Sequence, residues 1–167
     1  QIFLGKGDGL ADSSTQYWME LNTSNQLTVY VSNGTTGVTK AFTDLTISNT
    51  SWHHVVGTYD GETITLFIDG TSKAKTDLQG KIVLVSDNQK IGSDRGDRYF
   101  NGMLRDIRIY NHALTATEVT NNYNGIITKN GLVSWWKLDE PEGVRAFDCV
   151  GNNHGTYTNG PTYASPT

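Results

Sequence analysis

Cysteine is almost absent from this chain of 167 residues, in which Cys149 is the only residue of its type. A single cysteine excludes an intrachain disulfide framework, and it leaves no second thiolate for a zinc site or a CxxC redox pair. Stability must therefore come from a packed core. Cys149 itself is expected to be a small buried apolar residue, with an intermolecular disulfide as the alternative.

Charge is also scarce, and neither sign dominates. Lys and Arg number 13 against 17 Asp and Glu, which gives a formal net charge of -4, and no run of Lys or Arg occurs. Without a basic patch the chain has no electrostatic footprint for a nucleic acid or an anionic membrane. Neither partner is expected.

Long apolar runs are missing as well. No stretch approaches the roughly 20 apolar residues that span a bilayer, so we expect no membrane insertion. The chain starts at Gln1, with neither Met nor a signal-like segment, which predicts a processed or excised piece.

The chain does contain short runs of alternating apolar and polar residues, separated by Gly, Asn and Asp, a pattern typical of antiparallel sheets. In residues 27–31, for example, Leu27, Val29 and Val31 fall on one face of a strand, and Thr28 and Tyr30 fall on the other. The strands predicted in this way span residues 17–21, 27–31, 52–59, 63–68, 81–85, 89–91, 102–110 and 132–138.

One helix interrupts the strands. Thr115 and Glu118 form a T-x-x-E capping box, in which each side chain accepts a hydrogen bond from the other residue's backbone N–H. A short helix is therefore predicted near residues 115–123. Residues 126–130 look like a connector into the next strand.

Four segments carry a resemblance to a known family: WHHVVGTYDG at residues 52–61, LFIDG at 66–70, IG at 91–92 and FNGMLRDIRIYNHAL at 100–114. Together they resemble the LamG-like jelly-roll family, the laminin G-like branch of the concanavalin A-like lectin/glucanase superfamily. The resemblance implies an all-β fold, an antiparallel jelly-roll sandwich of two curved sheets. It also implies a non-catalytic module of secreted or surface proteins.

The family's segments occur here in an unusual order. GLVSWWKLDE at residues 131–140 and DCVGNNHG at 148–155 resemble the opening of the family's domain, yet they come last. We therefore predict a jelly roll over residues 1–125 that lacks its usual first strands, a connector over 126–130, and an opening segment over 131–167. That segment is permuted into the same domain, swapped into a neighbouring chain or the start of a tandem repeat. Missing strands leave unpaired edges, which favour self-association.

Catalytic patterns are not found. A retaining glucanase needs two carboxylates about 5–5.5 Å apart, often on an E-x-D-x-x-E strand that this sequence lacks. Asp139, Glu140 and Glu142 come closest, but Pro141 interrupts them, and a solvated turn is expected there. None of the four histidines accompanies a recognisable nucleophile. The chain is predicted not to be an enzyme.

Two loops could hold calcium, which prefers clustered carboxylate and carbonyl oxygens. The first carries Asp94 and Asp97, where the resemblance to pentraxins implies acidic ligands; a loop neutralised by Arg95 and Arg98 is the alternative. The second loop resembles the family's D-x-x-G-N turn, for which an Asx-turn held by hydrogen bonds alone is the alternative. Its candidate residues are Asp148, Gly151, Asn152 and Asn153.

Carbohydrate binding calls for aromatic faces next to groups that form hydrogen bonds. The candidates are Trp18, Tyr30, Tyr99 and Trp135. Trp52 and Trp136 match core positions of the family and are expected to pack inside.

The sequence thus predicts a non-catalytic extracellular or cell-surface module for binding or adhesion. Its partner would be a carbohydrate or a surface protein, with calcium as an expected aid. The alternative is a structural subunit of an extracellular filament or surface layer, assembled by strand exchange between neighbouring jelly rolls.

Overall fold

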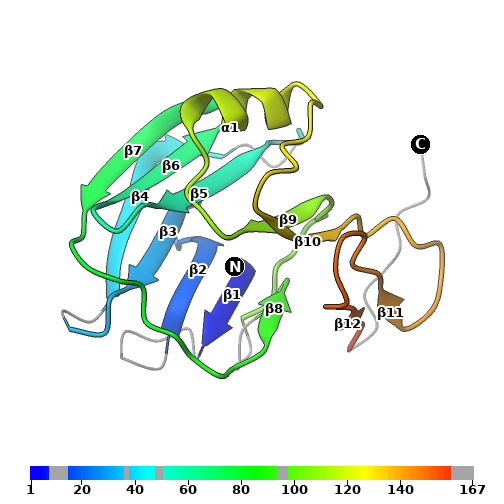
Figure 1. Ribbon diagram of the computed structural model, residues 1–167. Coiled ribbons are helices and arrows are strands. Elements are labelled where there is room, and N and C mark those ends of the chain that lie inside the picture. Colours follow the sequence, from blue (N-terminus) through cyan, green and yellow to red (C-terminus); the bar gives the residue numbers. More distant parts are fainter. Residues whose placement is uncertain (8–14, 36–37, 48–50, 94–97, 159–167) are drawn as a thin grey trace. The chain divides into compact units, whose positions relative to one another are not determined.

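A computed structural model of the chain describes residues 1–7, 15–35, 38–47, 51–93 and 98–158. The chain divides into two compact units, one made of residues 1–101 and 113–127 and the other of residues 102–112 and 128–167. Each unit is described by itself. All strand pairs between named strands are antiparallel, as expected for the all-β jelly-roll fold (Figure 1).

The first unit contains a five-stranded sheet with the strand order β4-β3-β2-β1-β8. Its strands are β1 (Ile2–Gly7), β2 (Thr15–Leu21), β3 (Gln26–Ser32), β4 (Val38–Thr46) and β8 (Gln89–Ile91). Asn25, with φ 58°, turns the chain between β2 and β3, and the Asn22 carboxamide oxygen accepts hydrogen bonds from the backbone N–H of Ser24 and Gln26. This hairpin confirms the predicted strands over 17–21 and 27–31.

A second sheet of the same unit joins β5 (Val55–Tyr59), β6 (Thr63–Ile68) and β7 (Thr71–Asp77) in that order. Asp69 and Gly70, with φ 51° and 76°, form the two-residue turn between β6 and β7, the left-handed geometry that favours tight hairpins. Gly57 in β5 lies against β3, because a Cβ atom placed on it would stand 2.8 Å from both Cγ atoms of Val29. The face of β3 that carries Val29 therefore points toward the second sheet.

The core of the first unit is apolar and includes α1 (Ala116–Tyr123), the one helix among the described residues. Both bonds of the predicted capping box are present between Thr115 and Glu118. The fully buried large apolar side chains are Ile2, Leu27, Ile64, Leu66 and Val119. Since α1 has eight residues, the described part of the chain holds no helix with the length and apolarity of a membrane span.

The second unit is smaller. It pairs β9 (Ile107–Tyr110) with β10 (Leu132–Trp136) and β11 (Arg145–Ala146) with β12 (Gly155–Thr156). Its buried residues are Ser134, Trp136, Ala146 and Asp148. β10 takes its hydrogen-bond partners from β9, which precedes the predicted connector at residues 126–130. The predicted domain bounds stay a prediction. How residues 131–167 are used among neighbouring chains stays a prediction.

Three predicted strand segments are not strands. Residues 52–54 lie before β5 and are not part of it. The His54 N–H donates to the Asp69 carboxylate, 2.9 Å away, and not to the backbone of a neighbouring strand. Residues 81–85 form no strand, and Leu84 is exposed. The strand predicted over 102–110 begins only at Ile107, because Asp106 has φ 56° and breaks the extended backbone.

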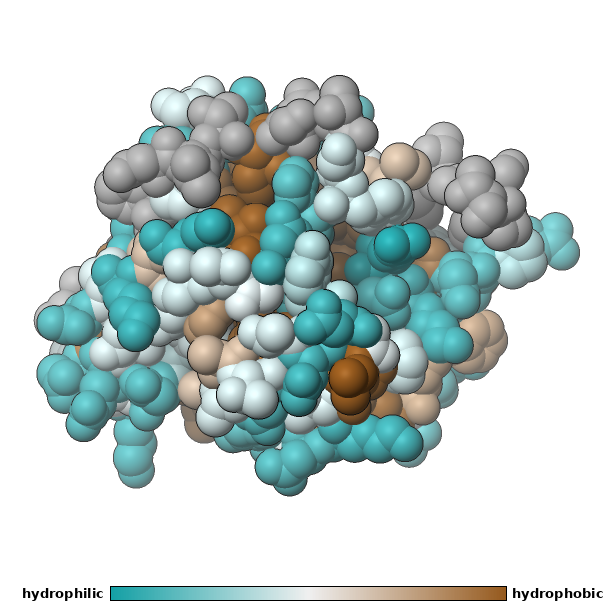
Figure 2. Space-filling view, turned by 90° about the horizontal axis from the view of Figure 1, so that it is seen from above, coloured by the Kyte–Doolittle hydropathy of each residue, from teal (hydrophilic) through white to brown (hydrophobic). Residues whose placement is uncertain are grey.

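Cys149 is exposed and not buried as expected. Its backbone N–H donates to the Trp135 carbonyl at 2.8 Å, which holds this stretch of chain along the outside of β10. On the face seen in Figure 2, hydrophilic and intermediate residues cover most of the coloured area, and hydrophobic residues show in a few smaller areas.

Candidate functional site

One row of residues crosses the face of the five-stranded sheet that is opposite to Val29. The register pairs Lys40 with Tyr30, Tyr30 with Trp18, Trp18 with Gly5, and Gly5 with Lys90. Paired residues point to the same side of a sheet. The row therefore places two aromatic rings in the middle and a lysine at each end.

The two rings are stacked. The centroids of Trp18 and Tyr30 lie 4.0 Å apart, and the ring planes differ by 14°. Because side chains stand roughly perpendicular to a sheet, one face of Trp18 is covered by Tyr30 and the other points toward Gly5 on β1. Trp18 is only 6% exposed, whereas Tyr30 is partly exposed.

The buried carboxylate of Glu20 orients the Tyr30 side chain. The Tyr30 hydroxyl donates to Glu20 Oε1 at 3.0 Å, and Arg98 Nη1 donates to Glu20 Oε2 at 3.3 Å. Burial, followed by the nearby charge of Glu20, raises the pKa of Tyr30 to about 12. Tyr30 is therefore a neutral phenol at physiological pH, held in one orientation by the Glu20–Arg98 pair.

A small hollow, with room for about one water molecule, lies beside Gly5 in the row. A Cβ atom at Gly5 would lie 3.2 Å from the Trp18 Cβ. The hollow is lined by Trp18, Lys90 and Ser93, among others. Two buried polar atoms on this side of β2, Trp18 Nε1 and Gln16 Oε1, have no hydrogen-bond partner among the described residues. One is a donor and the other an acceptor.

The structure brings some of the predicted sugar-binding residues together and not others. Trp18 and Tyr30 are in contact, and Tyr99, which is 52% exposed, pairs by an isolated bridge with Ser93 at the hollow. Trp135 belongs to the second unit. The core expectation holds for Trp136, at 6% exposed, and is wrong for Trp52, at 48%.

Sequence reasoning missed three residues of this site. Glu20 follows Trp18 by two positions in a strand, so the period of two could have placed it on the same face. Arg98 was named only in the alternative for the Asp94 and Asp97 loop, as a neutralising cation, and its contact with Glu20 was not predicted. The sequence does not mark Gly5 as a site residue, because its role depends on Trp18, which the register of β1 against β2 places beside it.

The Asp148 loop of the second unit is tightly organised around one carboxylate. Asp148 Oδ1 accepts hydrogen bonds from the N–H of Trp135 at 2.9 Å and of Val150 at 3.0 Å, and Oδ2 accepts from the N–H of Asn153 at 3.2 Å. The Asn153 amide also donates to Ser134 Oγ at 2.8 Å. The loop thereby attaches residues 148–153 to β10.

This arrangement does not fit a calcium ion. The N–H groups that surround the Asp148 carboxylate present positive ends of dipoles where a cation would need free oxygens. Asn152 is exposed, and a Cβ at Gly151 would lie 3.0 Å from Asp148 Oδ2, so the backbone fills that side. The geometry matches an Asx-turn held by hydrogen bonds, which is the alternative to a metal site.

Asp94 and Asp97 lie outside the described residues, so their calcium role stays a prediction. Within the described ranges, no group of three or more His, Cys, Asp or Glu could hold a metal ion.

The hydrogen bonds to Asp148 make the second unit sensitive to acid. Burial by itself raises the pKa of Asp148, but the N–H groups of Trp135, Val150 and Gly151 and the Ser134 side chain lower it more, from 3.8 to about 2. Because the pKa of Asp148 is lower in the folded chain than in the unfolded chain, the ionised carboxylate stabilises the fold at pH values above the unfolded-state pKa. This stabilisation is lost as the pH falls through the folded-state pKa. We expect about 2 kcal/mol to be lost as the pH falls from about 4 to about 2, measured as urea unfolding of the wild type. An Asp148→Asn variant should show less of this loss; an equal loss in both would contradict the assignment.

The carboxylates near Pro141 serve the fold. Glu140 was expected in a solvated turn, but its Oε1 accepts from the Phe147 N–H at 2.8 Å and its Oε2 accepts from the Tyr157 hydroxyl at 2.7 Å. His53 Nδ1 lies 2.8 Å from Asp69 Oδ2, at the turn between β6 and β7. Both carboxylates therefore hold loops in place.

Comparisons with known proteins agree with this architecture. A family model described as the concanavalin A-like lectin/glucanases superfamily, of the laminin G type, matches residues 1–120. A search of curated proteins gave no match.

Several solved structures are similar, two of them as follows. One is a "putative carbohydrate binding protein" from Bacteroides ovatus ATCC 8483, with a TM-score of 0.71 and 21% identity, over 99% of this chain and 53% of that one. The other is an S-layer domain-containing protein (residues 221–444) from Clostridium thermocellum ATCC 27405, with a TM-score of 0.42 and 22% identity, over 74% of this chain and 62% of that one. The chain thus spans about half the length of the Bacteroides protein. By its family match, the chain belongs to the concanavalin A-like lectin/glucanases superfamily.

Proposed function

We propose that the chain is a non-catalytic carbohydrate-binding module that acts outside the cell, and that the face of its five-stranded sheet that carries Tyr30 binds the glycan. The observation that carries this proposal is the row Lys40, Tyr30, Trp18, Gly5 and Lys90. It combines a stack of two aromatic rings, of which Tyr30 is partly exposed, with hydrogen-bond donors at both ends. Sites for small polar ligands commonly combine these features.

The chemistry of the row suits a sugar. The partly exposed Tyr30 ring can pack against the apolar C–H face of a pyranose, and the ammonium group of the partly exposed Lys90 can donate to its hydroxyls. The Bacteroides ovatus protein is named as a "putative carbohydrate binding protein", and this name supports the same class of ligand. Calcium assistance remains part of the proposal only for the loop with Asp94 and Asp97.

A glycan array followed by calorimetry tests the proposal. The wild type should retain at least one oligosaccharide. Tyr30→Ala should weaken its binding about tenfold or more, because the ring and its hydroxyl are both lost. Tyr123→Ala is the matched control, because Tyr123 is an exposed tyrosine of α1 that lies beside Gly70. The proposal fails if no sugar is retained, or if a folded Tyr30→Ala variant binds as the wild type does.

Repeating the titration with calcium and with EDTA tests the calcium loop. Binding that weakens in EDTA and in an Asp94→Asn variant supports it. Equal affinities in both buffers remove calcium from the proposal and leave the sugar site unchanged.

A structural role is the second candidate. Within the described residues β5 pairs with β6 on one side only, which leaves an edge for another strand. Light scattering of the purified chain decides this alternative. Chains that associate end to end support strand exchange, and a monomer over the tested concentrations rejects it.

A further inference from the structure

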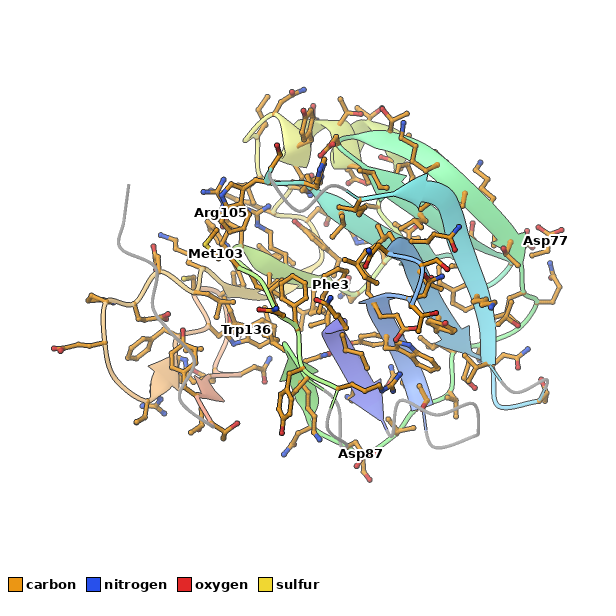
Figure 3. All side chains as sticks on the ribbon, turned by 180° about the vertical axis from the view of Figure 1, so that it is seen from behind. Phe3, Asp77, Asp87, Met103, Arg105 and Trp136 are labelled. Atoms are coloured by element: carbon orange, nitrogen blue, oxygen red, sulfur yellow. The ribbon has the colours of Figure 1, made fainter. Side chains whose placement is uncertain are left out.

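Tyr30 is held both at its ring and at its hydroxyl. The ring stacks on Trp18, with the centroids 4.0 Å apart and the planes at 14°. The hydroxyl donates to Glu20 Oε1 at 3.0 Å. Trp18 and Glu20 both belong to β2, which lies side by side with β3 in the sheet (Figure 3). The position of the Tyr30 hydroxyl is therefore set before any ligand arrives.

The Glu20 side chain decides which way this hydrogen bond runs. It is 10% exposed, and its second oxygen, Oε2, accepts from Arg98 Nη1 at 3.3 Å. A carboxylate paired with a guanidinium accepts hydrogen bonds and has none to donate. Burial and the charge of Glu20 raise the pKa of Tyr30 to about 12, so the phenol keeps its proton at neutral pH. The proton in this bond is thus the phenol's, and it points at Glu20.

The Tyr30 oxygen keeps its capacity to accept. A phenol has one O–H to donate and lone pairs with which to accept. The one O–H is taken up by Glu20, and among the described residues none donates a hydrogen bond to the Tyr30 oxygen. Tyr30 is partly exposed. Toward a ligand, its hydroxyl group therefore presents an acceptor and no donor.

We propose that Glu20 sets the specificity of this site, so that a saccharide is selected by a free hydroxyl that donates to the Tyr30 oxygen. Glu20 is a positioning residue, since it acts through Tyr30. An O-methylated sugar has no proton at that position, and its ether lone pairs would face those of Tyr30. The inference rests on the proposed function, because it names the group by which that site recognises its sugar.

Glu20→Gln reverses the hydrogen bond with little change in side-chain size. Arg98 can only donate, so it takes the carboxamide oxygen, and the carboxamide N–H turns to the Tyr30 oxygen. The phenol proton is then released toward the ligand. The variant should bind an ether at this position about as well as a hydroxyl.

Calorimetry measures this preference with three probes, cellotriose, mannotriose and galactotriose, each free and with one hydroxyl O-methylated at a time. We expect methylation of one hydroxyl to weaken wild-type binding of at least one probe about tenfold, and Glu20→Gln to reduce that factor about fivefold. The methyl group adds the same bulk in both proteins, so the change in the factor isolates the contact with Tyr30.

Two further variants complete the comparison. Tyr30→Phe keeps the stacked ring and has no hydroxyl, so it should also lose the preference for the free sugar, and it tests the inference if Glu20→Gln does not fold. Glu62→Gln is the matched control, because Glu62 is an exposed glutamate of the same unit. It should keep the wild-type preference.

A tyrosine titration tests the same hydrogen bond without a ligand. Nuclear magnetic resonance of protein labelled at tyrosine Cζ follows Tyr30, whose signal is the one missing from Tyr30→Phe. The charge and the hydrogen bond of Glu20 both raise the pKa of Tyr30. Glu20→Gln should therefore titrate at lower pH than the wild type, and Glu62→Gln should not. Equal midpoints in the wild type and Glu20→Gln would overturn the inference.

The inference and the proposed function can fail separately. If a free probe binds in a Tyr30-dependent manner, but methylation weakens binding equally in the wild type and Glu20→Gln, the inference is rejected and the function stands. If none of the three free probes binds, the inference and hexose binding at Tyr30 are both rejected, whatever the tyrosine titration gives.

Discussion

An Asp148→Ala variant is expected to lose the ordered structure of the second unit, at a cost of about 4 kcal/mol. The carboxylate is 5% exposed and accepts from the N–H groups of Trp135, Val150 and Asn153. Removing it leaves these three donors without an acceptor, and since the bonds are only part-buried, each loss should cost about 1–1.5 kcal/mol. The donors lie on β10 and on the loop that follows β11, so both should separate.

Urea unfolding followed by tryptophan fluorescence measures this effect, because Trp135 and Trp136 lie on β10 beside the loop. Asp139→Ala is the matched control, since Asp139 is exposed; it should unfold within about 0.5 kcal/mol of the wild type. The experiment also tests calcium at this loop. If excess calcium stabilises the wild type strongly and the variant not at all, Asp148 is a metal ligand and the loop is not held by hydrogen bonds alone.

The sequence predicted the local features of the fold best where chemistry between near neighbours decides them. The capping box of α1 and the hairpin of β2 and β3 depend on residues a few positions apart, and both are present as expected. The family resemblance added the jelly-roll class, which composition and periodicity alone do not specify.

Features that depend on distant partners were not predictable in this way. Residues 52–54 alternate like a strand, but Asp69, which is 15 positions away from His54, takes up the His54 N–H. Trp52 matches a core position of the family and is nevertheless 48% exposed. Periodicity shows which residues share a face and not what covers that face.

The candidate sites show the same limit. Trp18 and Tyr30 were chosen separately as aromatic residues, and only the register of β2 against β3 makes them one stack. Nothing marked Asp106 as the acceptor of the Trp135 indole N–H, because the two residues are 29 positions apart in sequence. Residue types indicated which side chains could bind a ligand, and the pairing between strands determined which of these side chains lie together.

A Gly57→Ala variant should destabilise the first unit by about 2 kcal/mol. The new methyl group would stand 2.8 Å from both Cγ atoms of Val29 and 3.4 Å from Cε of Met19. Met19 can move, but valine is branched at Cβ and has few other rotamers. The sheets must separate locally, and overpacking of this kind costs about 1–3 kcal/mol. Gly155→Ala is the control, since the nearest atom to its new methyl group is the Ala146 Cβ at 3.4 Å, an ordinary contact.

A double-mutant cycle with Val29→Ala identifies the cause. In the Val29→Ala background both Cγ atoms are gone, so Gly57→Ala should cost much less there than in the wild type, with a coupling of about 1 kcal/mol or more. Additive losses would mean that strand propensity or another neighbour is responsible. The cycle also links the core to the proposed site, because Tyr30 follows Val29 and points to the opposite face of β3. A shift of β3 away from β5 should move the Tyr30 ring, so the folded Gly57→Ala variant should bind its oligosaccharide more weakly, and the double variant should recover part of that affinity.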